Sequence, residues 1–256
     1  MKNKTFKVLG IILVLFVFIA LLLVPLNKKT AAKKIPKIRG QIAIVIDDWG
    51  YSLNNFLIIE QIKQPLTCGV LPGLKNSNLV MQKLNNLGFE IILHLPMEPK
   101  IKQNLEKNTI TLGLNTEQIH NIFQKDLASV AFAKGVSNHM GSCITEDKKA
   151  IAMVMAEAKE HKLYFFDSLV TSHSVCSALA KKIKIKFAKM DVFLDNQDSF
   201  EYIKGQLIRL RNVARKHGTA VGIGHDRKNT LLVLKKMLPQ MEAKGYKFVF
   251  LSQVVK

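Results

Sequence analysis

From about residue 40 onward, short apolar segments alternate with longer amphipathic ones. The short segments are rich in β-branched and aromatic residues, which favours strands, and the longer ones repeat apolar residues every three or four positions, which favours helices. The predicted strands are 42–46, 68–71, 90–95, 135–138, 164–166, 187–193, 220–223 and 247–251. The predicted helices are 53–63, 77–87, 116–130, 145–158, 174–182, 199–217 and 230–244. Seven or eight such units without a GxGxxG or GxxxxGK[ST] phosphate loop predict a distorted (β/α) barrel, not a doubly wound sheet.

The first predicted strand has the strongest signal. Residues 42–46 include four β-branched residues in five positions, so the strand is expected to be buried on both faces. Asp47 and Asp48 follow directly, then Trp49 and Gly50. Two adjacent carboxylates repel each other, and a metal ion would relieve the repulsion. The alternative is that the pair caps the next helix or forms an Asx-turn.

A barrel brings the carboxyl ends of its strands together at one rim, where its chemistry is found. Polar residues follow several of the predicted strands in this sequence. These residues are His94, His139, Asp167, Asp195, Asn196 and His225. Any one of these histidines could be a structural residue, but their joint placement predicts a metal or catalytic site. Neutral histidine and carboxylate together suit Zn²⁺ with one open coordination position.

The first 39 residues differ from the rest of the chain. Residues 8–26 are apolar and uncharged, and 19 residues are long enough to span a bilayer. We expect an uncleaved signal anchor and basic linker over 1–39 and one domain over 40–256. A cleaved signal peptide is the alternative, since 30–32 is a weak candidate cleavage site. The more basic flank follows the span, which by charge counting would favour a cytoplasmic domain.

The formal net charge of +19 comes partly from this segment. Residues 1–40 contain eight lysines, one arginine and no acid, so the rest of the chain carries +10. That remainder could serve an anionic polymer or a membrane surface, or it could be a solvated lysine-rich surface. Aromatic residues are few and no recognition motif is present, so a nucleic-acid partner is not expected. The three cysteines have no CxxC spacing and give no disulfide framework.

Six short motifs occur in a fixed order along the chain: IAIVIDDWG, ILHLPMEP, GVSNHMGS, FFDS, DVFLDN and GIGHD. In this order they resemble the divergent polysaccharide deacetylase family, which is related to the NodB-type carbohydrate esterases. The resemblance covers residues 40 to 254. It implies a distorted (β/α) barrel of the glycoside hydrolase and deacetylase type. It also implies a bacterial protein with its domain in the periplasm or otherwise outside the cytoplasm. Together with the anchor expected at residues 8–26, this predicts a single-pass protein of the inner membrane.

The resemblance also implies roles for individual residues. In the parent deacetylases, the first Asp of the pair is the general base and the second is a metal ligand, which correspond to Asp47 and Asp48. The parents supply two more ligands from an HxxxH motif, which this sequence lacks because Glu98 stands four positions after His94. His94 and His139 are therefore the expected further ligands. His225 stands where the parents have a general acid.

The other candidates are expected around the metal and the substrate. Asp167 is expected to orient one of the histidines or the general base Asp47 through a hydrogen bond, or only to cap a loop. Trp49 is either a platform on which a sugar stacks or a packed structural residue. Glu98, Asp195 and Asn196 are candidates for lining the substrate groove. Asp226 and Leu169 depart from the residues expected beside His225 and after Asp167–Ser168, which affects substrate contacts more than the metal.

The expected function is a metal-dependent hydrolase of the cell envelope, with Zn²⁺ as the favoured ion. It would remove acyl groups, such as acetyl, from a polysaccharide or a peptidoglycan-type glycan. One alternative is a non-catalytic protein that binds glycan or a partner through the same groove. Another is a phosphodiesterase, which would favour a second metal, and the sequence offers no clear second set of ligands.

Overall fold

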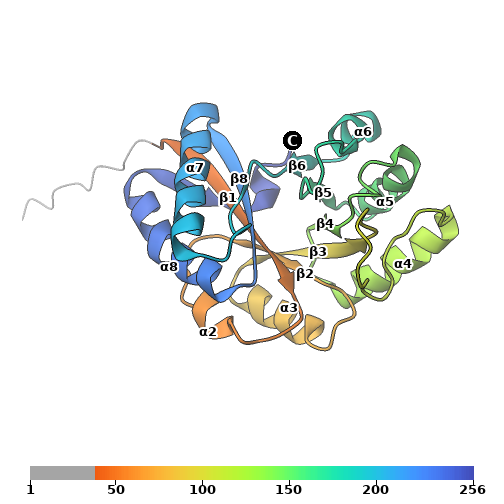
Figure 1. The fold of residues 1–256 in the computed structure, drawn as a ribbon, viewed down its shortest axis with the longest axis horizontal. Coiled ribbons are helices and arrows are strands. Elements are labelled where there is room, and N and C mark those ends of the chain that lie inside the picture. Colours follow the sequence, from red (N-terminus) through yellow and green to blue (C-terminus); the bar gives the residue numbers. More distant parts are fainter. Residues whose placement is uncertain (1–37) are drawn as a thin grey trace, which may run out of the picture. The chain divides into compact units, whose positions relative to one another are not determined.

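A computed structural model describes residues 38–256, which form a curled, entirely parallel sheet surrounded by helices (Figure 1). The strand order is β6-β5-β4-β3-β2-β1-β8-β7, and β9 pairs with the first part of β1. The strands are β1 (Gly40–Trp49), β2 (Thr67–Val70), β3 (Glu90–Met97), β4 (Gly135–Met140), β5 (Tyr164–Asp167), β6 (Phe187–Lys189), β7 (Val192–Phe193), β8 (Thr219–His225) and β9 (Tyr246–Val249).

The helices follow the strands along the chain. They are α2 (Phe56–Ile59), α3 (Ser77–Asn86), α4 (Thr116–Ser129), α5 (Lys148–Glu160), α6 (Cys176–Ile183), α7 (Phe200–His217) and α8 (Lys228–Ala243). Several begin with a side-chain cap that the sequence provides. Asn115 and Gln118 form a reciprocal capping box at α4, and Ser199 accepts a hydrogen bond from the Tyr202 amide at α7. Gly218, with φ of 83°, ends α7 in the left-handed conformation that glycine adopts easily.

Strand β1 is the centre of the core, as its apolar run predicts. Its side chains alternate between two buried clusters. Ile42, Ile44 and Ile46 pack in the larger cluster with residues of the surrounding helices, and Ala43 and Val45 pack in a smaller cluster with apolar residues of β5 and β8. All five are 0% exposed. A strand with both faces covered needs apolar residues at every position, and this explains the unbroken run.

The barrel is open. Strands β6 and β7 are the two edges of the sheet, because β6 pairs only with β5 and β7 only with β8. The prediction of one strand over 187–193 was therefore wrong. Residues 190–191 carry the chain from one edge to the other, and the segment pairs with different neighbours on each side. The predicted distorted barrel is confirmed in the form of a curled half-barrel.

Two local predictions need correction. The helix expected over 53–63 is reduced to the single turn of α2. Ile59 at the end of this turn and Ile62 after it are both buried. The helix expected to start at Thr145 starts at Lys148 with Asp147 as its cap. The Thr145 hydroxyl instead donates to the Gly141 carbonyl, so it stabilises the turn after β4.

The connection from β3 to α4, residues 98–115, is long and irregular, as its lack of periodicity predicts. It is pinned near its end by Ile110, which is 0% exposed and forms an isolated bridge with Met97. The Glu98 carboxylate accepts a hydrogen bond from the Leu112 amide. The part of this connection before Ile110 reaches the carboxyl ends of the strands, where the candidate site lies.

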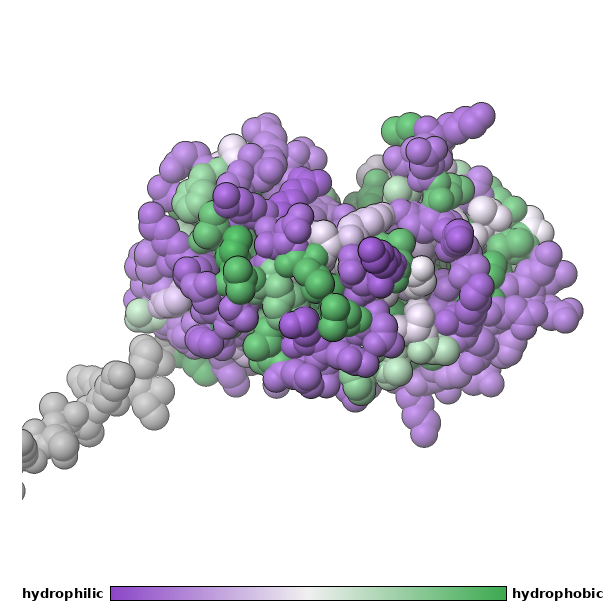
Figure 2. All heavy atoms as spheres, turned by 90° about the horizontal axis from the view of Figure 1, so that it is seen from below, coloured by the Kyte–Doolittle hydropathy of each residue, from purple (hydrophilic) through white to green (hydrophobic). Residues whose placement is uncertain are grey.

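Within residues 38–256, no helix has the length and apolar character that crossing a membrane requires. The anchor expected at residues 8–26 lies outside the described residues and stays a prediction, as does the boundary at residue 39. The surface on the side of α2 and α3 is mostly hydrophilic, with apolar patches (Figure 2). Leu57 of α2, Leu79 of α3 and Leu87 at the end of α3 are each more than 40% exposed.

One buried acid outside the site predicts how stability depends on pH. Asp126 of α4 is 1% exposed, and burial raises its pKa to about 6 despite a hydrogen bond from the Asn108 side chain. The folded state therefore binds a proton on Asp126 more tightly than the unfolded state does. The contribution of this protonated side chain to stability is fully present below about pH 4 and is lost as pH rises through about 6. Asp126→Asn is therefore expected to stabilise the fold at pH 8, by on the order of 1 kcal/mol after solvent screening.

Thermal unfolding of wild type and Asp126→Asn at pH 4 and pH 8 measures this effect. The melting temperature of the variant should exceed that of wild type by a few degrees at pH 8, and the difference should shrink at pH 4. Asp198→Asn removes an exposed acid and is the control. Equal melting temperatures at pH 8 would contradict the prediction.

Candidate functional site

The carboxyl end of β1 contains a bulge that turns both of its aspartates toward the inside of the curled sheet. Residues Ile46 and Trp49 pair with Cys68 and Val70 of β2, so three residue steps on β1 oppose two on β2. Asp48 takes up the extra residue and has φ of 66°, which is uncommon for a side-chain-bearing residue. In a regular strand Asp47 and Asp48 would point to opposite faces. The bulge is therefore what allows both to contribute to one site.

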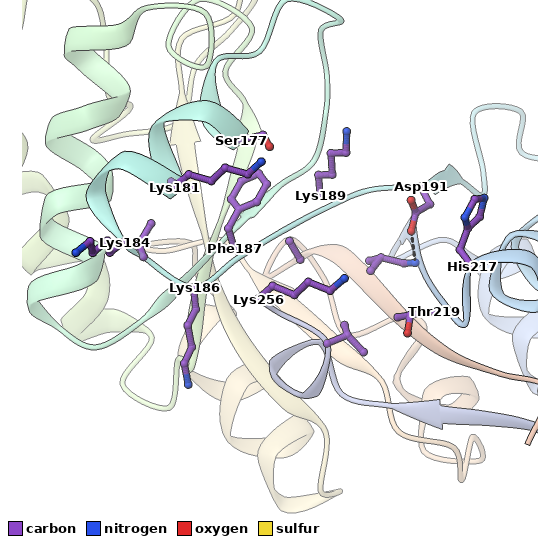
Figure 3. A pocket seen from close by; sticks show the side chains of 15 residues that line it. Ser177, Lys181, Lys184, Lys186, Phe187, Lys189, Asp191, His217, Thr219 and Lys256 are labelled. Atoms are coloured by element: carbon purple, nitrogen blue, oxygen red, sulfur yellow. Dashed lines mark hydrogen bonds between the residues drawn. The ribbon is translucent and has the colours of Figure 1, made fainter.

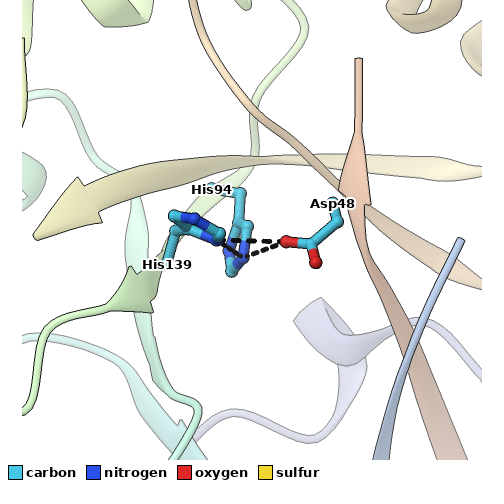
Figure 4. A group of neighbouring side chains, drawn as sticks. All are labelled: Asp48, His94 and His139. Atoms are coloured by element: carbon cyan, nitrogen blue, oxygen red, sulfur yellow. Dashed lines mark hydrogen bonds and ion pairs between the residues drawn. The ribbon is translucent and has the colours of Figure 1, made fainter. Parts of the chain in front are cut away.

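Three side chains from three strand ends converge on one another (Figure 4). Asp48 comes from β1, His94 from β3 and His139 from β4. Asp48 Oδ1 is 3.3 Å from His94 Nε2 and 3.0 Å from His139 Nδ1, and the two nitrogens are 3.2 Å apart. We call Asp48 Oδ1, His94 Nε2 and His139 Nδ1 the donor triangle.

The donor triangle fits a metal ion. Ligands at about 2.0–2.1 Å from a tetrahedral zinc ion lie about 3.3 Å apart, close to the separations found here. The donor set of two imidazoles and one carboxylate is one that zinc accepts. Within residues 38–256, six buried side-chain N or O atoms lack a hydrogen-bond partner, and four of them belong to Asp47, His139 and Glu106. Unsatisfied polar atoms are costly, so this concentration marks a functional site.

The charges of the site are strongly coupled. Burial alone would raise the pKa of Asp48, but hydrogen bonds with His139 and His94 outweigh burial and hold this pKa well below its usual range. Burial would lower the pKa of His139, but its hydrogen bond with Asp48 raises it instead. Asp48 is therefore a carboxylate at neutral pH, which is the form that binds a cation.

Asp47 lies deeper than Asp48. It is 1% exposed, its Oδ2 is 3.5 Å from His94 Nδ1, and that nitrogen is 2.7 Å from Ser137 Oγ. Burial raises the pKa of Asp47. A carboxylate with a raised pKa accepts a proton more readily, which suits a general base.

His225, at the end of β8, is held by a buried acid on the loop after β7. Asp195 is 0% exposed, and its Oδ1 is 2.9 Å from His225 Nδ1. Asp195 Oδ2 accepts hydrogen bonds from the His225 amide and the Thr230 hydroxyl. The ion pair outweighs burial and raises the pKa of His225, and it lowers that of Asp195. His225 Nε2 is left 4.0 Å from Asp48 Oδ2, on the donor-triangle side.

Sequence comparison identifies the family. The sequence model described as divergent polysaccharide deacetylase matches residues 44–255. The chain belongs to this family. YibQ of Escherichia coli (strain K12) is 34% identical over 203 residues, which make up 79% of this chain and 64% of that protein. The match thus spans less than two thirds of YibQ.

Solved structures share the fold of this chain. A protein from Agrobacterium tumefaciens C58 has a TM-score of 0.81 at 24% identity, over 84% of this chain and 89% of that one. A family 4 carbohydrate esterase from Streptomyces lividans, solved in complex with acetate, has a TM-score of 0.54 at 14% identity, over 82% and 91%. At these identities the likeness establishes the curled half-barrel fold.

Several residues expected at the site have other surroundings. Trp49 is 0% exposed and packs edge-on against Phe56, so it is a core residue and not an exposed platform for a sugar. Asp167 accepts hydrogen bonds from the Leu169 amide and the Ser174 hydroxyl, so it caps the loop after β5 and does not orient a histidine.

The three residues expected to line the groove lie in three different surroundings. Asp195 lies behind His225 and is fully buried, so it positions that histidine and does not line a groove. The side chain of Glu98 accepts a hydrogen bond from the Leu112 amide and so links the two ends of the β3–α4 connection. Asn196 is exposed and has no side-chain hydrogen bond within the described residues.

Sequence reasoning missed four residues that shape the site. Ser137 and Glu106 contact the far nitrogens of His94 and His139, and the Tyr51 hydroxyl donates to Glu106. A Cβ on Gly69 of β2 would overlap Asp47 Oδ1. Ser137 and Gly69 lie in predicted strands. Side chains alternate between the two faces of a strand, so the strand pattern could have indicated which face each residue shares. Nothing in the sequence indicated that Glu106 or Tyr51 would reach the site.

Gly69→Ala tests the close approach of β2 to Asp47. The added methyl group has to displace the buried Asp47 carboxylate, so we expect a loss of about 1–3 kcal/mol in stability. Gly205→Ala in α7 is the matched control, because nothing lies within 4 Å of the added Cβ. It should stabilise the fold slightly, since alanine favours helix more than glycine does. Thermal melts measure both, and an unchanged melting temperature for Gly69→Ala would show that Asp47 can move freely.

Proposed function

We propose that this chain is a metal-dependent hydrolase that removes acyl groups, such as acetyl, from a glycan of the bacterial cell envelope. The donor triangle carries the proposal, because it gathers two imidazoles and a carboxylate at the separations that a metal ion requires. Membership of the divergent polysaccharide deacetylase family supports the glycan substrate. Zinc is the proposed ion, and residues 8–26 are proposed to hold the domain outside the cytoplasm at the inner membrane.

Each residue of the site has a proposed task. Asp48, His94 and His139 hold the ion, which when bound polarises the acyl carbonyl and makes water a better nucleophile near neutral pH. Asp47 accepts the proton of the attacking water. His225, oriented by Asp195 through Nδ1, donates a proton from Nε2 to the leaving amine or alcohol.

The test combines metal analysis with an assay for released acetate. The purified full chain is stripped with a chelator, reloaded with Zn²⁺ and offered acetylated chito-oligosaccharide, acetylated xylan and peptidoglycan. We expect about one equivalent of metal and acetate release from at least one substrate. A folded chain that retains no metal would overturn the proposal. A chain that retains metal and binds glycan but releases no acetate would favour the non-catalytic alternative.

A further inference from the structure

The connection between β3 and α4 carries one carboxylate toward the donor triangle. Residues 101–107 form a mostly exposed run, with Leu105 43% exposed and Lys107 also exposed. The Glu106 side chain between them is only 12% exposed. An acidic side chain turned inward from an exposed run loses hydration, so something inside has to compensate for that loss.

The contacts of Glu106 identify that partner. Its Oε1 accepts a hydrogen bond of 2.5 Å from the Tyr51 hydroxyl and lies 3.4 Å from His139 Nε2. Its Oε2 is buried and has no hydrogen-bond partner. His139 Nε2 is likewise buried without a hydrogen bond, while His139 Nδ1 belongs to the donor triangle. Glu106 therefore faces the nitrogen of His139 that points away from Asp48 and His94.

We propose that Glu106 is a positioning residue for His139, and that Glu106 and Tyr51 together fasten residues 99–109 over the site when a metal is bound. The inference rests on the proposed function and deepens it. A proton on His139 Nε2 directed at Glu106 leaves the Nδ1 lone pair free for an ion. Metal-binding histidines commonly direct their other nitrogen at a carboxylate in this way.

The same contacts couple the loop to the site. Ile110 pins the end of the segment through its bridge to Met97, and Tyr51 lies on the loop after β1, 55 residues from Glu106 in sequence. The Tyr51–Glu106 hydrogen bond thus joins the loop that follows Asp48 to the connection whose Glu106 contacts His139. An ion that fixes His139 strengthens the Glu106 contact, and the loop is then held more firmly.

Metal affinity tests the positioning role. Zinc affinity of the full chain is measured by competition with a chelator, and the absorption spectrum of the Co²⁺-loaded chain reports ligand geometry. Glu106→Ala is expected to weaken zinc binding about 10–100-fold and to alter the Co²⁺ spectrum. Glu106→Gln keeps an acceptor oxygen and should recover part of the loss. Glu160→Gln, on the exposed end of α5, is the control and should match wild type.

Limited trypsin digestion tests the fastening. Lys102 and Lys107 are exposed cleavage sites in the segment. Zinc should slow cleavage there in wild type, and Tyr51→Phe and Glu106→Ala should lose this protection. If wild type binds zinc and the Glu106 variants match it in affinity, spectrum and digestion, this inference alone is overturned. If wild type binds no zinc, the proposed function fails together with it.

A second inference rests on a cavity far from this site. A cavity of about 720 Å³ lies between α6, β6 and the amino end of β8. Thr219 lines it, while the candidate site is at His225, about 20 Å farther along β8 at 3.3 Å per residue. Its floor is apolar and includes Phe187 and Val221. The cavity is thus at the open seam of the half-barrel, at the end where β1 begins.

The cavity is strongly basic. Its lining includes five lysines and one histidine, which are Lys181, Lys184, Lys186, Lys189, Lys256 and His217. Figure 3 shows Lys181, Lys189 and Lys256 around Phe187. None of the five lysines forms an ion pair with a carboxylate of residues 38–256. The one acid of the lining, Asp191, accepts a hydrogen bond from the Val221 amide. The excess of five lysines over this one carboxylate concentrates positive potential in the concave surface.

We infer that this cavity binds the phosphate of an anionic phospholipid headgroup. The apolar floor beside the lysines suits a lipid better than a fully hydrated anion. The chain also enters the domain at this end through residues 38–40, after a segment with six basic residues at 28–39. Basic side chains near a membrane surface are attracted to anionic headgroups, which is the chemistry that this lining offers.

Native mass spectrometry of the full chain in a neutral detergent tests this binding. Phosphatidylglycerol, phosphatidylcholine and inorganic phosphate are added in turn to wild type, to Lys181→Glu/Lys189→Glu and to the control Lys148→Glu/Lys149→Glu. We expect retention of phosphatidylglycerol to fall at least about tenfold in the cavity variant and not in the control. Equal loss in both variants would overturn the site. Displacement of the lipid by an equal concentration of inorganic phosphate would overturn the lipid assignment in favour of a soluble phosphate ligand.

Discussion

Replacing Asp47 with asparagine is expected to lower the rate of acyl hydrolysis by about 10²–10⁴-fold while metal binding is retained. Asparagine keeps the shape of the side chain but cannot accept a proton from water. Asp47 is not part of the donor triangle, whose three atoms lie 3.0–3.3 Å apart, so we expect these separations to be kept in the variant. The loss should appear in kcat, with KM little changed, because the interaction is made in the transition state.

The position of Asp47 allows two roles, a general base or a residue that orients His94, and the prediction distinguishes them. Its Oδ2 also lies 3.5 Å from His94 Nδ1, so Asp47 could instead act by orienting His94. An orienting residue would lose metal affinity on substitution, by about 10–100-fold. Measuring zinc affinity and kcat on the same Asp47→Asn preparation separates the two roles. Weakened zinc binding with normal kcat at saturating zinc would contradict the role of general base.

Asp48→Asn is expected to abolish activity through loss of the metal. Asp48 contributes the single negative charge of the donor triangle and lies within 3.3 Å of both histidine nitrogens. Its low pKa keeps it ionised, so asparagine removes a full charge from the site. The drop in zinc affinity should exceed the about 10–100-fold that loss of an outer partner costs.

The control for Asp48→Asn is Asp226→Asn, which removes a neighbouring acid that is bonded to Asn55 and lies outside the donor triangle. Metal content by mass spectrometry after dialysis should fall well below one equivalent for Asp48→Asn and stay near one for the control. Circular dichroism establishes that each variant is folded. A folded Asp48→Asn chain that keeps its metal would remove Asp48 from the ligand set.

The sequence alone determined the order of the elements and the strand at the centre. Residues 42–46 could be assigned to a buried strand because a strand covered on both faces needs apolar residues at every position. The strand ends could be named as a site because parallel strands bring their carboxyl ends to one edge, and His94, His139 and Asp48 do meet there. Motif order identified the family, which the match over 44–255 confirms.

Only the tertiary structure decided how the residues at those strand ends are used. Local sequence does not specify the bulge that turns Asp48 inward, because it arises from how β1 pairs with β2. The inward positions of Trp49, Asp167 and Asp195 likewise follow from what packs over each strand end. Glu106 reaches His139 from 33 residues earlier in the chain, through a loop without periodicity. Contacts of this kind depend on how loops close and pack, and neither composition nor residue spacing indicates that.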